Sequence, residues 1–306
     1  MLFRSDCRDI VSRSSIMEIL EGRGAGPNKD YVLLKLDHLG EKILNERLPG
    51  ILALSRKFMN IDPVKEPIPV VPTCHYQMGG IPTTINGQVL THAKGKDHVV
   101  EGLFAAGECA CVSVHGANRL GTNSLLDLVV FGRAIGLHCE EALKQGMDHR
   151  KEAEGEIDRA LSRQARWENS ANTEDPYAIR AEMKTTMQNN FGVFRNAEHM
   201  EKGLKTLQGL RERLQQAKLS DHSKAFNTTR IEMFELDNMM ETALVTATLA
   251  DGRKESRGAH ARYDFKERDD KHWLKHSLCD THGSVDYRPV CLQPKTIKPI
   301  ALKLRG

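Results

Sequence analysis

Side chains that could bind a carboxylate occur in one glycine-rich stretch, His115-Gly-Ala-Asn-Arg-Leu-Gly-Thr-Asn-Ser124. Arg119 lies there in a loop expected between a strand and a helix. A guanidinium can hold a carboxylate through two parallel hydrogen bonds. By spacing alone, a surface arginine is the better interpretation of Arg119. For His115, four residues earlier, we expect a structural hydrogen bond.

Two further residues could act on an acidic ligand. His75 lies in Pro72-Thr-Cys-His-Tyr-Gln-Met-Gly-Gly80, where paired glycines would let the backbone approach a ligand closely. A histidine there could donate to a carboxylate, although a structural histidine is more common. Arg8 is a poor general base by its ordinary pKa. Nothing in its local sequence distinguishes it from a solvated surface arginine.

A nucleotide could be bound where a predicted strand gives way to a predicted helix. Glu108 follows the apolar stretch 103–106, and a carboxylate at the end of a strand can accept hydrogen bonds from ribose hydroxyls. A helix that begins at Asn123-Ser124 would offer free N–H groups and the positive end of its dipole. The alternative is an ordinary strand–helix unit with a solvated Glu108, and the pattern alone favours it.

The elements that would position these residues are mixed. The first half of the chain predicts short helices, short strands and one long helix, with Asn123 or Ser124 as its N-cap. Four prolines within 63–72 predict an extended connector. The predicted helices are 14–21, two short ones within 41–59 that are split at Pro49-Gly50, and 124–144; the predicted strands are 87–90, 98–102 and 103–106.

The second half of the chain is different in character. Helical spacing persists from about 152 to 249, with one helix restarting at Asp175-Pro176, and predicts an antiparallel helical bundle. From Gly252 onward the sequence is polar with few periodic signals, and we expect irregular structure there.

Composition excludes some classes of protein. The chain has 306 residues, 40% hydrophobic and 28% charged, which is typical of a globular protein. A net charge of only +3 argues against nucleic acid as the main partner. No apolar run is long enough to span a membrane, and Arg4 and Asp6 argue against a signal peptide. Seven scattered cysteines fit a reducing compartment as buried free thiols, and we expect no metal site.

Four stretches together are far more specific than any one of them. They resemble the succinate dehydrogenase and fumarate reductase flavoprotein family almost residue for residue. Ser113 to Gly116 and Ser124 to Asp127 favour the succinate dehydrogenase branch over fumarate reductase and L-aspartate oxidase. The four stretches are Thr73–Pro82, Gly102–Glu108, His115–Arg133 and Glu255–Phe265, the last with Glu267–Asp270 close behind.

The resemblance implies a fold of mixed α+β and α/β character. It would comprise the remainder of a capping domain (1–67), the C-terminal part of a Rossmann-like FAD-binding domain (68–148), an antiparallel helical bundle (149–250) and an irregular C-terminal tail (251–306). The family's chain starts with a Gly-x-Gly-x-x-Gly fingerprint. The stretch Gly22 to Gly26 has the wrong spacing for it.

The resemblance also implies an activity, the oxidation of succinate to fumarate. A hydride passes to FAD, and electrons pass on towards quinone, as in succinate dehydrogenase (quinone). By match to the family's motifs, Arg8 is the expected proton acceptor, and His75 and Arg119 are the expected substrate ligands. Flavin contacts are expected from three residues of 68–148: Glu108, Ser124 and Leu125.

The expected partners are succinate or fumarate and the iron–sulfur and membrane-anchor subunits of complex II, with no nucleic acid. The expected location is the cytoplasmic face of a bacterial inner membrane or the matrix face of the mitochondrial one. The histidine that bonds covalently to FAD has no counterpart, so we expect an N-terminally incomplete chain that binds flavin poorly and does not oxidise succinate alone. Two alternatives stay open: a fumarate reductase or L-aspartate oxidase fragment, and a non-catalytic module that docks on the iron–sulfur subunit.

Overall fold

The computed structural model describes residues 8–146, 151–169 and 171–292. Within these ranges the chain divides into two compact units, one on each side of the bond between Tyr76 and Gln77. Each unit is described by itself below. Among the described residues, no helix is both long and apolar enough to cross a membrane.

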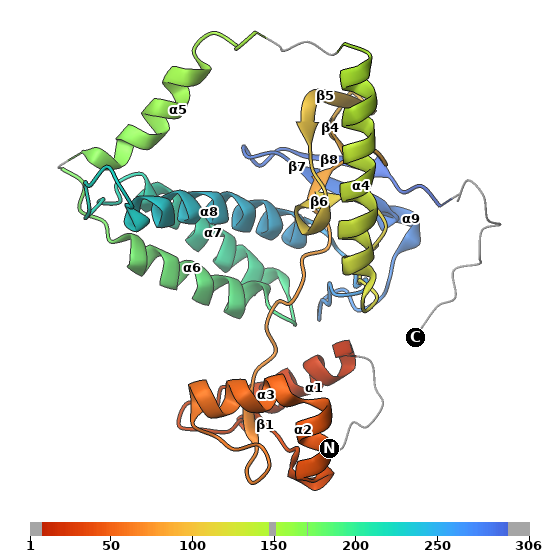
Figure 1. The fold of residues 1–306 in the computed structure, drawn as a ribbon, viewed down its shortest axis with the longest axis vertical. Helices are drawn as coiled ribbons and strands as arrows, with labels where there is room; N and C mark the ends of the chain where they lie inside the picture. Colours follow the sequence, from red (N-terminus) through yellow and green to blue (C-terminus); the bar gives the residue numbers. More distant parts are fainter. Residues whose placement is uncertain (1–7, 147–150, 170, 293–306) are drawn as a thin grey trace. The chain divides into compact units, whose positions relative to one another are not determined.

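The first unit is built from short helices around a two-stranded antiparallel sheet (Figure 1). Val32 faces Val70 across that sheet. The core of this unit contains Leu44, Leu52 and Ile68, each at most 6% exposed. The elements are α1 (Arg8–Leu20), β1 (Val32–Leu34), α2 (Glu41–Arg47), α3 (Pro49–Leu54) and β2 (Ile68–Val70), with a 3-10 turn at Asp37–Leu39 and a π turn at Ser55–Met59.

Two sequence predictions for this unit differ from the structure in detail. The first helix begins at Arg8, well before the predicted residue 14, because Arg8 to Arg13 contains no glycine or proline to stop it. The two short helices predicted within 41–59 are present, and Pro49 starts the second of them, where its missing N–H costs no hydrogen bond. The predicted extended connector supplies β2.

The second unit opens with short strands and one long helix. β4 (Gln88–Ala93) and β5 (Lys96–Phe104) form an antiparallel hairpin, and β3 (Ile81–Pro82) pairs in parallel with β6 (Ala110–Cys111). Every sheet among the described residues has two strands. Helix α4 (Asn123–Lys144) lies along these strands in Figure 1.

The outer face of α4 is apolar and exposed. Ile135 packs against Gly87 and Leu128 against Gly107, so one side of the helix contacts the strand region. Other apolar side chains of α4 face away from it. They are Leu125, Leu126, Val129, Val130, Leu137 and Leu143, each between 49% and 69% exposed.

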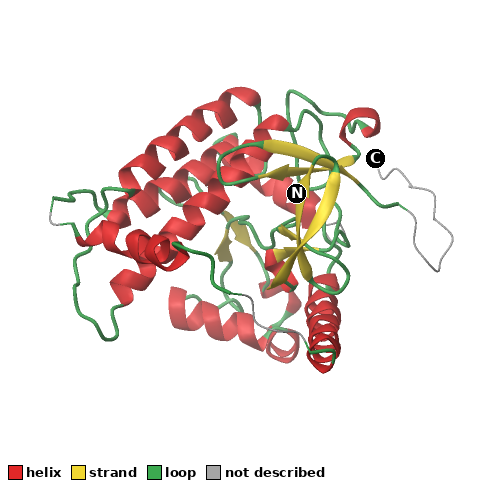
Figure 2. Ribbon diagram, turned by 90° about the horizontal axis from the view of Figure 1, so that it is seen from above, coloured by secondary structure: helices red, strands yellow, loops and turns green. Residues whose placement is uncertain are grey.

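A helical region follows α4, and its helices are drawn in red with all the others in Figure 2. Among the described residues it holds the largest hydrophobic cluster. Its buried side chains include Met200, Leu207 and Met240, all 0% exposed. Trp167 is also buried, and its Nε1 donates to the Leu214 carbonyl at 3.2 Å. The helices are α5 (Glu156–Ala165), α6 (Pro176–Phe191), α7 (Ala197–Leu214) and α8 (Thr228–Gly252), with a 3-10 turn at Arg166–Glu168.

The prediction of an irregular C-terminal region from Gly252 is wrong for the described part. That part contains α9 (Asp270–Trp273) and an antiparallel hairpin of β7 (Lys275–Cys279) and β8 (Val285–Pro289). It also buries Glu255 completely. Charged residues fill this interior by pairing with one another, so no apolar periodicity marks it in the sequence.

The cysteines were expected to be buried free thiols. The six described cysteines are free, but none is buried: Cys74, Cys109 and Cys291 are exposed, and the others are half-buried. Cys7 lies outside the described residues. Among these cysteines, the pKa of the Cys279 thiol is raised. Partial burial is the main cause, and the negative charge of Asp280 adds to it.

Candidate functional site

The N-terminus of α4 is the centre of the candidate site. Thr122 precedes the helix in a left-handed conformation with φ 68°, and its side chain makes no capping hydrogen bond. The prediction of Asn123 or Ser124 as the N-cap is therefore wrong, since both lie in the first helical turn. The Ser124 hydroxyl accepts a hydrogen bond from Arg119.

Arg119 lies against this helix end. Its Nη1 donates to the Ser124 Oγ at 3.0 Å, and the side chain is half-buried. Spacing alone favoured a surface position for Arg119, whereas in the structure its side chain is half-buried. A guanidinium and a helix N-terminus that adjoin each other make a strongly electropositive place, which suits an anion such as a carboxylate.

His115 ties the beginning of the loop to the helix that follows it. Its Nε2 is 2.8 Å from the Asp127 Oδ2, and Asp127 is only 5% exposed. The structural hydrogen bond expected for His115 is confirmed. The loop that leads into α4 has left-handed residues at Ser113, before His115, and at Thr122, after it. Residues with a side chain adopt this conformation only when the surroundings hold them.

Glu108 sits in the 3-10 turn Gly107–Cys109, three residues after β5 ends. One carboxylate oxygen accepts a hydrogen bond from the Gln77 N–H at 3.0 Å, and the side chain is exposed. This turn contacts α4. The N–H of Leu125 donates to the Thr122 carbonyl at 3.0 Å, and the Leu125 side chain is 64% exposed.

The other two predicted site residues belong to the first unit. His75 is exposed there. Arg8 is the first residue of α1, and its side chain lies outside what the structure describes. The structure thus brings Arg119 and Ser124 together in the second unit and places His75 and Arg8 in the other one.

The second glycine of the pair after His75 also makes a close approach within the chain, and the approach to a ligand stays a prediction. A Cβ on Gly80 would lie 2.5 Å from the Cys109 carbonyl oxygen. The close approach that this glycine permits is therefore to the chain's own backbone, where β3 and β6 pair. This packing holds the segment after Gln77 beside Glu108.

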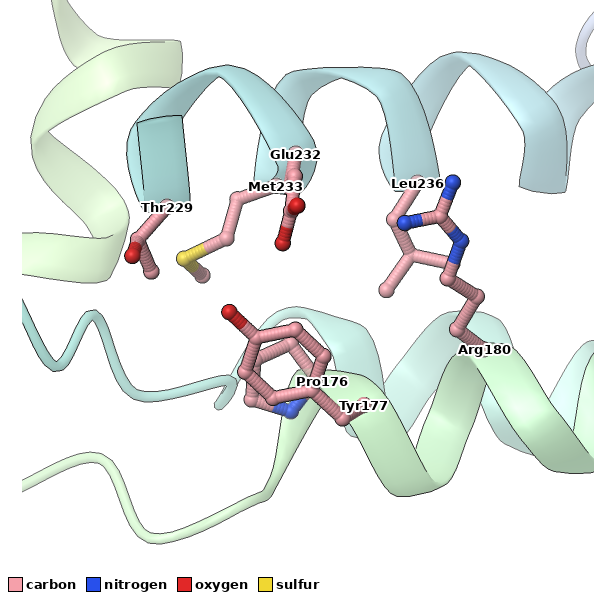
Figure 3. A pocket seen from close by; sticks show the side chains of 7 residues that line it. All are labelled: Pro176, Tyr177, Arg180, Thr229, Glu232, Met233 and Leu236. Carbon is pink, nitrogen blue, oxygen red and sulfur yellow. The ribbon is translucent and has the colours of Figure 1, made fainter. Parts of the chain in front are cut away.

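Two hollows lie elsewhere in the second unit. The one between α6 and α8, lined by Tyr177, Arg180 and Met233 among others, has a volume of about 10 Å³ (Figure 3). That is room for about one water molecule. The other, between the β4–β5 and β7–β8 hairpins, has a volume of about 280 Å³ and is lined by His92, Asp97, Ser113, His276 and Arg288, with Gly95, Pro289 and Cys291.

The residues at the start of α4 fit a flavin nucleotide in part. The helix end lacks a side-chain cap, and the exposed Glu108 carboxylate lies on a turn that contacts the same helix. Such a pair of groups suits a ligand with both anionic and hydroxyl groups. Fold and site together fit a protein that binds a nucleotide cofactor.

Comparison with known proteins agrees with this class. Residues 3–125 match the family model described as "FAD binding domain", and residues 180–303 match that described as "Fumarate reductase flavoprotein C-term". The succinate dehydrogenase flavoprotein subunit of Coxiella burnetii is 62% identical over 301 residues, which are 98% of this chain and 51% of that protein. The fumarate reductase flavoprotein subunit of a Serratia strain is 44% identical over 89% of this chain and 44% of its own length.

A solved structure of a mutant quinol fumarate reductase FrdA from E. coli has a TM-score of 0.83 and 40% identity, and the match covers 96% of this chain and 50% of that chain. The chain belongs to the succinate dehydrogenase and fumarate reductase flavoprotein family, whose cofactor is FAD. It spans about half the length of the curated relatives it matches.

Proposed function

We propose that the chain forms the substrate- and flavin-facing part of a succinate dehydrogenase (quinone) flavoprotein subunit. The observation that carries the proposal is the hydrogen bond from Arg119 to Ser124 at the uncapped N-terminus of α4. It places a cation beside a helix dipole, in a loop whose sequence matches the family. The 62% identity to a succinate dehydrogenase subunit favours succinate over fumarate as the substrate.

Each site residue then has a task. Arg119 binds one carboxylate of succinate through its guanidinium, and His75 donates to a carboxylate of the same molecule. Arg8 takes the proton from the carbon next to the one that loses hydride, and this requires an acceptor that relays the proton away from it. Glu108, Ser124 and Leu125 would hold the flavin. Bound FAD would supply the hydride acceptor.

We also propose that further polypeptide covers α4 in the working enzyme. Six exposed apolar side chains on one helix face support this, because such patches mark surfaces that pack against something else. The half-length match to the relatives is consistent with it. The iron–sulfur and membrane-anchor subunits of complex II are the proposed partners, with the flavoprotein peripheral on the cytoplasmic or matrix face of the membrane.

The decisive experiment supplies the polypeptide that this chain does not match. The chain is co-expressed with the unmatched half of the Coxiella burnetii relative, and the purified product is assayed for FAD content and for reduction of a dye by succinate. We expect FAD and turnover only in the combined protein, with the chain alone low in FAD and inactive. Arg119→Gln is expected to lower kcat/KM by about 100-fold, a loss of roughly 3 kcal/mol of binding to a charged group.

Four outcomes would contradict the proposal. A combined protein that holds FAD but does not oxidise succinate would contradict the proposed activity. Preference for fumarate reduction or L-aspartate oxidation would assign the chain to one of those related enzymes instead. If Arg119→Gln leaves turnover unchanged, Arg119 is not the substrate ligand that the proposal assigns. Binding to an iron–sulfur subunit without FAD would support the non-catalytic module instead.

A further inference from the structure

The loop that carries Arg119, residues 112–122, contacts a distant part of the second unit. The N–H of Ala259 donates to the Ala117 carbonyl at 2.9 Å. The Ser113 Oγ lies 3.2 Å from the His276 Nε2. Only Asn118 lies between Ala117 and Arg119, so the first of these contacts fixes the backbone close to Arg119.

The approach of the two backbones is as close as glycine allows. Gly258 has φ +58°, and a Cβ there would lie 2.4 Å from the Ala117 carbonyl oxygen and 2.6 Å from its carbonyl carbon. Real Cβ atoms essentially never come so near to backbone, so any side chain at residue 258 must displace one of the two segments. Glycine is therefore required here by the neighbouring loop as well as by its own conformation.

The turn that presents Gly258 and Ala259 is closed on itself. The N–H of Arg257 donates to the His260 carbonyl at 2.8 Å, and the N–H of His260 donates back to the Arg257 carbonyl at 3.0 Å. A turn closed in both directions is a stiff support for the amide at its tip.

The buried Glu255 carboxylate stabilises this turn. Its carboxylate is 0% exposed and accepts hydrogen bonds from Arg253 at 2.6 Å, from Arg257 at 2.8 and 2.9 Å, and from the Asp269 N–H at 3.0 Å. Arg257 also donates to Asp270 at 2.7 Å. A buried carboxylate that accepts four such hydrogen bonds holds the surrounding backbone in one arrangement.

We infer that Gly258 and Ala259, supported by buried Glu255, position the 112–122 loop so that Arg119 meets the substrate carboxylate. They are positioning residues, because neither they nor Glu255 is assigned a contact with substrate or flavin. The expected effect on succinate binding rests on the proposed function. The contact between the turn and the loop does not depend on the proposed function.

The first test measures the order of the loop in the full chain. Amide hydrogen exchange of peptides covering 112–122 is compared between the wild type and Gly258→Ala. We expect exchange to become at least about tenfold faster in that loop. The matched control is Gly283→Ala, since Gly283 also has positive φ, at 86°, but nothing lies within 4 Å of its Cβ position. Unchanged exchange in Gly258→Ala, or an equal change in the control, would overturn the inference.

Glu255→Gln serves as a milder second variant if Gly258→Ala does not fold. It leaves the loop contact in place but removes the charge that anchors the turn, and we expect faster exchange in 112–122 as well as in 253–260. Faster exchange confined to 253–260 would contradict the coupling between turn and loop.

The second test asks whether the turn acts through Arg119. The Kd for succinate is measured calorimetrically for Gly258→Ala in the wild-type and in an Arg119→Lys background. We expect about a tenfold weakening in the first background and less than about twofold in the second, because the two changes affect one interaction. Equal weakening in both backgrounds would show a general structural effect and overturn the inference.

The two claims fail in different ways. If the FAD-loaded combined protein binds no succinate although the 112–122 loop loses protection in Gly258→Ala, the proposed function fails and the turn–loop support stands. If succinate binds through Arg119 while Gly258→Ala changes neither exchange nor Kd, the proposed function stands and this inference fails.

Discussion

Removal of the Glu255 carboxylate is the perturbation whose cost the structure defines best. Burial by itself would raise the pKa of Glu255, but hydrogen bonds from Arg257, from the Asp269 amide and from Arg253 outweigh it and lower that pKa. The group is therefore charged and paired in the folded protein. Glu255→Ala leaves Arg253 and Arg257, whose side chains are only 16% and 18% exposed, without this acceptor.

The expected cost follows from those contacts. One partner removed from a buried ion network destabilises a protein by about 3–5 kcal/mol. Arg257 keeps its bond to Asp270, and Arg253 keeps its bonds to the carbonyls of Trp273 and Lys275. These remaining partners place the estimate for Glu255→Ala at the lower end, about 3 kcal/mol.

Urea unfolding followed by tryptophan fluorescence measures this cost. Trp273 reports on the region directly, because the Arg253 guanidinium stacks over its ring at 5.2 Å. Glu154→Ala, at an exposed position, is the control and should change the free energy of unfolding by less than about 0.5 kcal/mol. A loss below about 1 kcal/mol for Glu255→Ala would refute the view that this carboxylate anchors its surroundings.

Three further predictions concern stability. Burial, and after it the charge of nearby arginines, lowers the pKa of His260 from 6.5 to about 4. The unfolded chain thus binds more protons between these values, and the free energy of unfolding should fall by up to about 3 kcal/mol as pH drops from 6.5 to 4; His260→Gln should flatten this pH dependence in urea titrations. Leu207→Ala, at a fully buried position, should cost about 2–5 kcal/mol in the same assay, and a cost below about 1 would contradict the packed core. Asp127→Ala should lower stability by about 1–3 kcal/mol because it leaves His115 without its buried acceptor, and a thermal melt equal to that of the wild type would argue against that bond.

Local signals in the sequence predicted much of the fold. The long helix expected at 124–144 is α4, found at Asn123–Lys144, because apolar residues recur along it at helical spacing. Asp175 caps α6 by accepting from the Tyr177 N–H, as the Asp-Pro pair indicated. The prediction of the α4 N-cap failed because the helix already begins at Asn123, after Thr122 in a left-handed conformation that no local rule indicated.

Hydrophobic periodicity could not predict the structure of the C-terminal region. Its interior is made of charged groups such as Glu255 and Arg262, which pair only after distant segments meet. The sequence carries Gly258 within a stretch that resembles the family, but its close approach to Ala117 depends on a contact 141 residues away in the chain. No local rule would reveal such a requirement. The roles of Arg8, His75, Arg119, Glu108, Ser124 and Leu125 stay predictions.

Calorimetric titration of succinate into the FAD-loaded combined protein, in which the chain is co-expressed with the unmatched half of the Coxiella burnetii relative, tests the central claim most directly. The account predicts saturable binding that Arg119→Gln weakens by about tenfold or more, which corresponds to the loss of one charge-assisted contact. Arg159→Gln, at a 75%-exposed side chain on α5, should leave the Kd unchanged. Binding that is absent in the folded wild type, or equal in the wild type and Arg119→Gln, would contradict it.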